Sequence, residues 1–113
     1  MHEYSVGLAL MDRIEVEARA RGATAVHRVR LTIGEVSGIE PELLASAFEI
    51  LRERTICQHA VLDITRVPAR WVCPTCATPI QSGGVLRCPA CGNAARLVGG
   101  DEIVLAQLEM EVP

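Results

Sequence analysis

Residues 25–33, which read AVHRVRLTI, decide the fold of this chain. Apolar and polar side chains alternate here with a period of two, which is typical of a β-strand with one buried face. The residues expected on the buried face are Val29, Leu31 and Ile33, and those expected on the other face are Arg28, Arg30 and Thr32. We predict a half-buried strand at this point, and the neighbouring elements follow from it.

An amphipathic helix is predicted on each side of this strand. The first covers residues 4–20, because apolar side chains recur at every fourth position, and Gly22 stands where a left-handed cap would end a helix. The second begins at Pro41, which suits a first helical turn, and is expected to end near Arg54. The side chains expected to point inward are Val6, Leu10, Ile14 and Ala18 in the first helix, and Leu44, Ala47, Phe48 and Leu51 in the second.

Two further strands are predicted. One covers residues 60–67, with Leu62 and Ile64 on one face, and Pro68 closes it. The other covers residues 104–112, and the apolar residues expected to alternate along it are Val104, Ala106, Leu108, Met110 and Val112. The strand–helix–strand unit should form a right-handed parallel crossover, and the last strand should return to the same sheet. The fold class is therefore α+β, with a three-stranded mixed sheet and two helices.

Four of the five cysteines form two Cys-x-x-Cys pairs between the last two predicted strands. Cys73-Pro-Thr-Cys76 and Cys88-Pro-Ala-Cys91 are tight turns that can each aim two sulfur atoms at one point. Four thiolates make a closed tetrahedral site, which suits a structural zinc ion and leaves no open position for catalysis. We predict one zinc per chain in an inserted, zinc-ribbon-like domain of residues 69–98, with residues 1–68 and 99–113 forming one discontinuous domain. Trp71 should pack beside the cluster or at its junction with the sheet.

Other uses of these cysteines are iron in the same sulfur cage, as in a rubredoxin-like electron carrier, and redox dithiols or disulfides. The remaining thiol, Cys57, lies two residues before His59. That pair could mark a nucleophile, but no third group orients it, and a free cysteine is most often a small buried hydrophobe. The role of Cys57 and His59 is left open.

Composition argues against several classes of protein. The net charge is −3 and aromatic residues make up 3% of the chain, so neither a basic face nor stacking platforms for nucleic acid are expected. No apolar run approaches the roughly 20 residues that cross a bilayer, and the start lacks a signal-peptide pattern, which predicts a cytoplasmic protein. The sequence shows no catalytic constellation and no phosphate-binding glycine loop, so we expect no enzyme activity.

The first three residues, Met1-His2-Glu3, offer a possible chelate. The terminal amine, the backbone nitrogen of His2 and its imidazole can close a five-membered and a six-membered ring around one metal ion. Such a ligand set favours square-planar nickel(II) or copper(II). On spacing alone the usual interpretation prevails, in which a histidine near a chain end is a solvated residue.

The whole chain resembles the HypA/HybF family of hydrogenase maturation factors. The resemblance rests on the start Met1-His2-Glu3-Tyr4-Ser5, on Ile33-Gly34-Glu35, on Ser46-Ala47-Phe48-Glu49 and on the two cysteine pairs in this order. It implies a nickel metallochaperone that acts with a HypB-type GTPase to deliver nickel to the large subunit of nickel–iron hydrogenase, with the urease accessory machinery as a further partner. The competing hypothesis is a zinc-ribbon adaptor or nucleic-acid-binding module.

The resemblance also implies roles for individual residues. His2 becomes the principal nickel ligand, with the Met1 amine and Glu3 completing the site, and Glu40 is a lesser candidate because some relatives carry an aspartate there. The zinc ligands become the same four cysteines that the spacing indicates. Some relatives also carry a histidine beside a cysteine pair, which this module lacks. The target enzyme, the nickel affinity, the full ligand set and the oligomeric state are not determined by the sequence.

Overall fold

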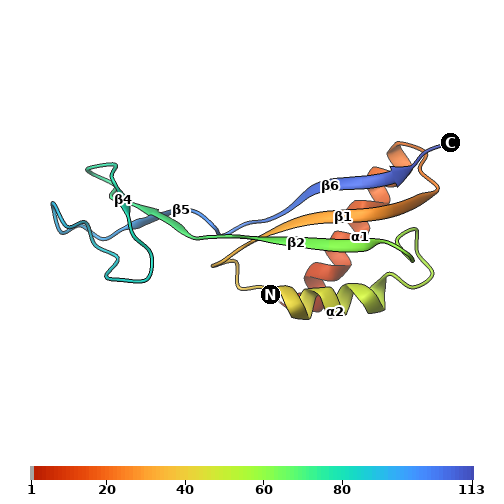
Figure 1. The fold of residues 1–113 in the computed structure, drawn as a ribbon, viewed down its shortest axis with the longest axis horizontal. Coiled ribbons are helices and arrows are strands. Elements are labelled where there is room, and N and C mark those ends of the chain that lie inside the picture. The colour runs from red at the N-terminus through yellow and green to blue at the C-terminus, as the bar shows by residue number, and fades with distance from the viewer. Residues whose placement is uncertain (1) are drawn as a thin grey trace.

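A computed structural model of the protein describes residues 2–113. Its elements follow the predicted order of helix, strand, helix, strand, cysteine segment and strand (Figure 1). They are α1 (Glu3–Ala20), β1 (Ala25–Gly34), α2 (Pro41–Leu51), β2 (Val61–Val67), β3 (Arg70–Val72), β4 (Pro79–Ile80), β5 (Arg96–Gly99) and β6 (Ile103–Glu111). None of the helices in the described part of the chain is long and apolar enough to cross a membrane.

The larger sheet has the strand order β2-β1-β6. Strand β1 pairs in parallel with β2, where Leu31 lies opposite Ile64, and antiparallel with β6, where Val29 lies opposite Leu108. The predicted mixed sheet is thus confirmed, with the strand of residues 25–33 at its centre. Both helices pack on one face of this sheet (Figure 1), where Val29 and Leu31 are almost fully buried.

The predicted helical faces and their ends are largely confirmed. All four stripe residues of α1 are buried, and Gly22, with φ of +65°, follows its last turn. The N–H of Gly22 donates to the carbonyl of Arg19, and the N–H of Ala23 donates to that of Ala18, which is the Schellman pattern of bonds. Helix α2 starts at Pro41 as predicted but ends at Leu51, three residues before the expected end.

The early end of α2 has a local cause. Arg54 has a φ of +61°, a left-handed conformation that no α-helix can contain. The carbonyl of Arg52 accepts hydrogen bonds from both the N–H and the hydroxyl of Thr55, which turns the chain toward β2. The Arg52 guanidinium donates to the carbonyl of Ala60, 2.6 Å away, and fixes that turn against the start of the strand.

One expectation about β6 is wrong. The predicted alternation placed Val104 and Ala106 on the same face as Leu108 and Met110, but Val104 and Ala106 are exposed. A β-bulge explains the difference, because Gln107 pairs with Arg30 and Leu105 pairs with Leu31, which leaves Ala106 without a partner. The residues that pack against the core are Ile103, Leu105, Leu108 and Met110. The predicted inward position of Val112 is also wrong, since it lies beyond the strand and is exposed.

The cysteine segment forms a second sheet of order β4-β3-β5 at one end of the molecule (Figure 1). The sequence analysis assigned no strands here, because strands of two to four residues carry too little periodicity. The molecule is elongated, with extents of 57 × 25 × 17 Å. A small apolar cluster of Cys73, Ile80 and Cys88 holds this end together, and Trp71 packs against it as predicted.

Candidate metal centres

The four cysteines of the two pairs come together in space, as their spacing predicts. The sulfur atoms of Cys73, Cys76, Cys88 and Cys91 all lie within 4.8 Å of one another, and those of Cys73 and Cys91 are 3.4 Å apart. Zinc–sulfur bonds of about 2.3 Å in a tetrahedron would place the sulfur atoms about 3.8 Å apart. The donor set and its dimensions therefore fit a four-coordinate ion such as zinc.

The two cysteine turns have the same backbone structure. The N–H of Ala77 donates to the carbonyl of Cys73 at 2.9 Å, and the N–H of Gly92 donates to that of Cys88 at 2.8 Å. Both Ala77 and Gly92 adopt a left-handed conformation, with φ of +59° and +76°. Two equivalent turns thus face each other, and each supplies one buried and one exposed sulfur to the cluster.

The electrostatics of the cluster separate its buried and exposed thiols. The backbone N–H of Cys91 lowers the pKa of Cys88 to about 6, and that of Cys76, 3.3 Å from the Cys73 sulfur, lowers the pKa of Cys73. Hydrogen bonding with the neighbouring sulfur of Cys91 raises the pKa of Cys76 to about 12. Backbone donors therefore favour negative charge on the two buried sulfurs, and a divalent cation would favour thiolates at all four.

Two side-chain contacts that the sequence analysis did not predict stabilise the cysteine turns, one between the turns and one within the second turn. The side-chain amide of Asn93 donates to the hydroxyl of Thr75 at 2.9 Å and joins one turn to the other. The guanidinium of Arg87 donates to the carbonyl of Gly92 at 3.0 Å. Asn93 lies two residues after Cys91, close to the second pair, but spacing alone does not predict a hydrogen bond across 18 residues.

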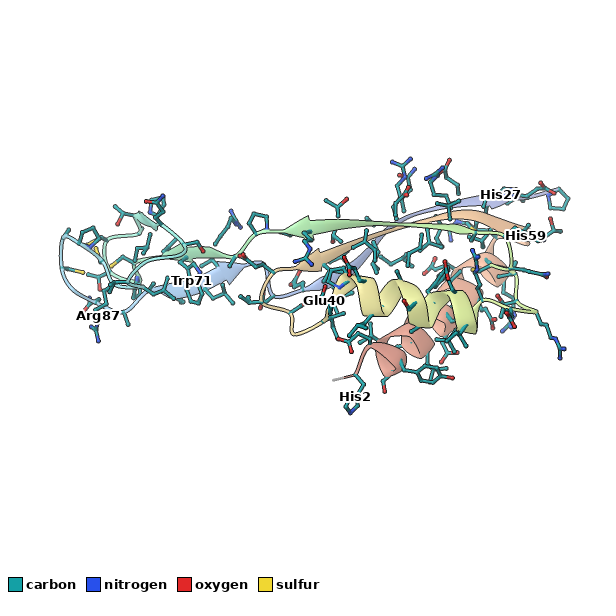
Figure 2. The ribbon with its side chains drawn as sticks, turned by 60° about the horizontal axis from the view of Figure 1, so that its bottom comes forward. His2, His27, Glu40, His59, Trp71 and Arg87 are labelled. Carbon is teal, nitrogen blue, oxygen red and sulfur yellow. The ribbon has the colours of Figure 1, made fainter. Side chains whose placement is uncertain are left out.

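His2 lies at the N-terminal end of α1, in an extended conformation with φ of −89° and ψ of 146°. Its carbonyl accepts the first helical hydrogen bond, from the N–H of Val6, while its side chain is exposed and makes no cap. Figure 2 shows the imidazole directed away from the body of the protein. Met1, the other main candidate ligand of the predicted chelate, lies outside the described residues.

Glu3 and Glu40 are brought together, although they are far apart in the sequence. A carboxylate oxygen of Glu3 accepts the N–H of Glu40 at 3.0 Å, and this bond lowers the pKa of Glu3 below its ordinary 4.5. The carboxylate of Glu40 pairs with the guanidinium of Arg66 at 3.2 Å. The start of α1 is thereby attached to the start of α2 and to β2. The sequence analysis did not single out Arg66.

The remaining histidines and the fifth cysteine lie elsewhere. Cys57 is fully buried in the main core, as expected of a small hydrophobe, whereas His59 is exposed. His27 pairs with Glu111 at 3.2 Å. Within residues 2–113, the four cysteines are the only group of three or more His, Cys, Asp or Glu side chains close enough to hold an ion.

Comparisons with known proteins agree with this arrangement. Residues 1–110 match the model of a family described as "Hydrogenase/urease nickel incorporation, metallochaperone, hypA". Hydrogenase maturation factors HypA from Shewanella oneidensis and Wolinella succinogenes are 41% and 38% identical to the chain, and each alignment covers 98% of it and 96% of the relative. The solution structure of the nickel metallochaperone HypA from Helicobacter pylori superimposes with a TM-score of 0.75 at 32% identity, covering 100% of both chains. The chain belongs to the HypA family of nickel-incorporation metallochaperones, which are not enzymes.

Proposed function

We propose that this protein binds nickel(II) at its N-terminus and delivers it, with a HypB-type GTPase, to the large subunit of nickel–iron hydrogenase during maturation. The observation that carries the proposal is the exposed imidazole of His2, which is free of a capping bond at the start of a helix in a nickel-incorporation family. Nickel is the cargo, and the same terminus could serve urease through its accessory machinery. The protein would act in the cytoplasm.

The proposed nickel site is built from the first residues of the chain. The Met1 amine, the backbone nitrogen of His2 and its imidazole would form two fused chelate rings, a set that favours square-planar nickel(II). The Glu3 carboxylate is a further candidate, and one of its two oxygens already accepts the N–H of Glu40. Glu40 itself is held by Arg66, so a metal ion would have to compete with that ion pair. Binding through few free ligands suits an ion that must be released.

The four-cysteine cluster has a structural role in this proposal. Cys73, Cys76, Cys88 and Cys91 would hold one zinc ion, which would stabilise a region whose apolar cluster is too small to fold alone. We assign the zinc-binding domain to residues 69–98 and the nickel-binding domain to residues 1–68 with 99–113. The closed site leaves the cysteines no role in catalysis.

Nickel titration by calorimetry tests the proposal. Extending the N-terminus by a few residues removes the free amine, and His2→Ala removes the imidazole, so each should weaken nickel binding sharply while zinc content stays unchanged. His59→Ala removes another exposed imidazole and is the matched control, which should bind nickel like the unmodified protein. Acidification should also release the ion, because protons compete with nickel for the amine and the imidazole.

Equal nickel affinity in the untagged, extended and His2→Ala proteins would place the ion elsewhere and overturn the proposed site. The partners are tested separately, by co-purification from the native cell. A GTPase and a hydrogenase large subunit are the expected partners. Recovery of nucleic acid or polymerase subunits in their place would favour the zinc-ribbon adaptor.

A further inference from the structure

The second sheet is joined to the first at a junction where three segments of the chain meet. Residues 34–36 are the end of β1 and the start of the loop after it, residues 67–69 lead from the end of β2 to β3, and residues 100–102 connect β5 to β6. The N–H of Glu35 donates to the carbonyl of Val67, and the N–H of Val36 donates to that of Gly100, both at 2.8 Å. The loop after β1 is thus bonded to both of the chain segments that lead to the cysteine module, which we define as residues 69–98.

Two glycines bring the backbones at this junction into direct contact. A Cβ atom on Gly34 would overlap the carbonyl group of Gly100. Gly100 has a φ of +89°, and a Cβ atom on it would lie 2.6 Å from the Cα atom of Ala69. Because no side chain separates the three segments, they have little room to move relative to one another.

Glu35 adds a side-chain bond at the point where the ladder of β2 has ended. Pro68 has no N–H, and Ala69, which is buried, lies outside both β2 and β3. A carboxylate oxygen of Glu35 accepts the N–H of Ala69 at 2.8 Å, across 34 residues of sequence. A charged acceptor makes this bond stronger than one between neutral groups. It satisfies a buried donor that the strands leave unpaired.

We propose that Glu35 is a positioning residue that fixes the cysteine module to the helix-covered sheet, so that the two move as one rigid body in solution. Figure 1 shows the module projecting from the end of the sheet, and this junction is where the chain enters and leaves it. If the N-terminus carries nickel as proposed above, a partner meets that terminus and the module at a fixed separation. The rigidity itself does not depend on nickel.

Residual dipolar couplings of the backbone amides test this in the zinc-loaded full chain. In the unmodified protein, the couplings of the module and of the larger sheet should fit one common alignment tensor. Glu35→Ala removes the acceptor, and Glu35→Asp shortens it by one methylene, so both should require two tensors. Amide exchange of Ala69 should become at least about tenfold faster in both variants, as expected for a lost bond to a charged group.

Two controls separate positioning from general damage. Glu35→Gln retains an oxygen that can accept the bond and should keep the single tensor. Glu102→Ala removes a carboxylate of the same junction that makes no hydrogen bond or ion pair within residues 2–113, and should also keep it. Protection of the Val29 amide reports that the main sheet is folded. Two tensors in the unmodified protein, or one tensor in both Glu35→Ala and Glu35→Asp, would overturn the proposal.

Discussion

The thiol of Cys57 shows how burial changes the chemical behaviour of one residue. Burial in the main core raises its pKa from 9.0 to about 11, with the Glu15 carboxylate as a smaller cause. Its thiolate fraction at pH 8 is then about a hundredfold below that of an unperturbed thiol. We predict that Cys57 stays unmodified in folded, zinc-loaded protein treated with an alkylating reagent at pH 8, as measured by peptide mass spectrometry.

The raised pKa of Cys57 also determines the direction in which pH changes the stability of the protein. The folded state holds the thiol proton of Cys57 more tightly than the unfolded state does. The contribution of this thiol to the free energy of unfolding is therefore complete below pH 9.0 and is lost as the pH rises toward about 11. Cys57→Ala lacks the ionising group, so its free energy of unfolding should fall less steeply between these two pH values. Rapid alkylation of Cys57 in the folded protein would contradict the raised pKa. So would an identical pH dependence of the free energy of unfolding in the unmodified protein and in Cys57→Ala.

At the scale of elements, the end of α1 depends on the conformation of one glycine. Gly22 has a φ of +65°, and an alanine there would carry a Cβ atom into a conformation that L-residues disfavour. We predict that Gly22→Ala lowers the free energy of unfolding by about 1 kcal/mol, as measured by urea denaturation. Arg19→Ala, an exposed change in the same turn, should alter it by less than about 0.5 kcal/mol. Equal effects of the two changes would show that the cap is unimportant.

At the scale of the whole molecule, the protein has two apolar clusters of very different size. The main cluster joins both helices to the larger sheet, whereas the module's cluster is built around Cys73, Ile80 and Cys88. We predict one zinc per chain by elemental analysis. Cys73→Ser or Cys91→Ser should lose that zinc and the amide protection of residues 69–98, while the sheet and helices stay folded. Unfolding of the whole chain, absence of zinc, or iron in its place would contradict this.

The sequence by itself determined the features that depend on neighbours along the chain. The period of side chains identified the central strand and the buried stripe of α1, and Gly22 and Pro41 marked helix ends through their own backbone preferences. The spacing of the cysteines indicated that four sulfurs would meet, because each Cys-Pro-x-Cys turn fixes its own geometry. These signals are local, so they can be recognised in the sequence without knowledge of the fold.

Only the tertiary structure decided the features that depend on which segments meet. The run Ile103-Val104-Leu105-Ala106 is apolar throughout, so its inward side was set by the bulge opposite β1 and not by its pattern. The strands of the module are too short to show a period, and they form because a partner strand satisfies their backbone groups. The hydrogen bond from the Ala69 N–H to the Glu35 carboxylate joins polar groups that no local rule connects, since the fold alone brings them within 2.8 Å.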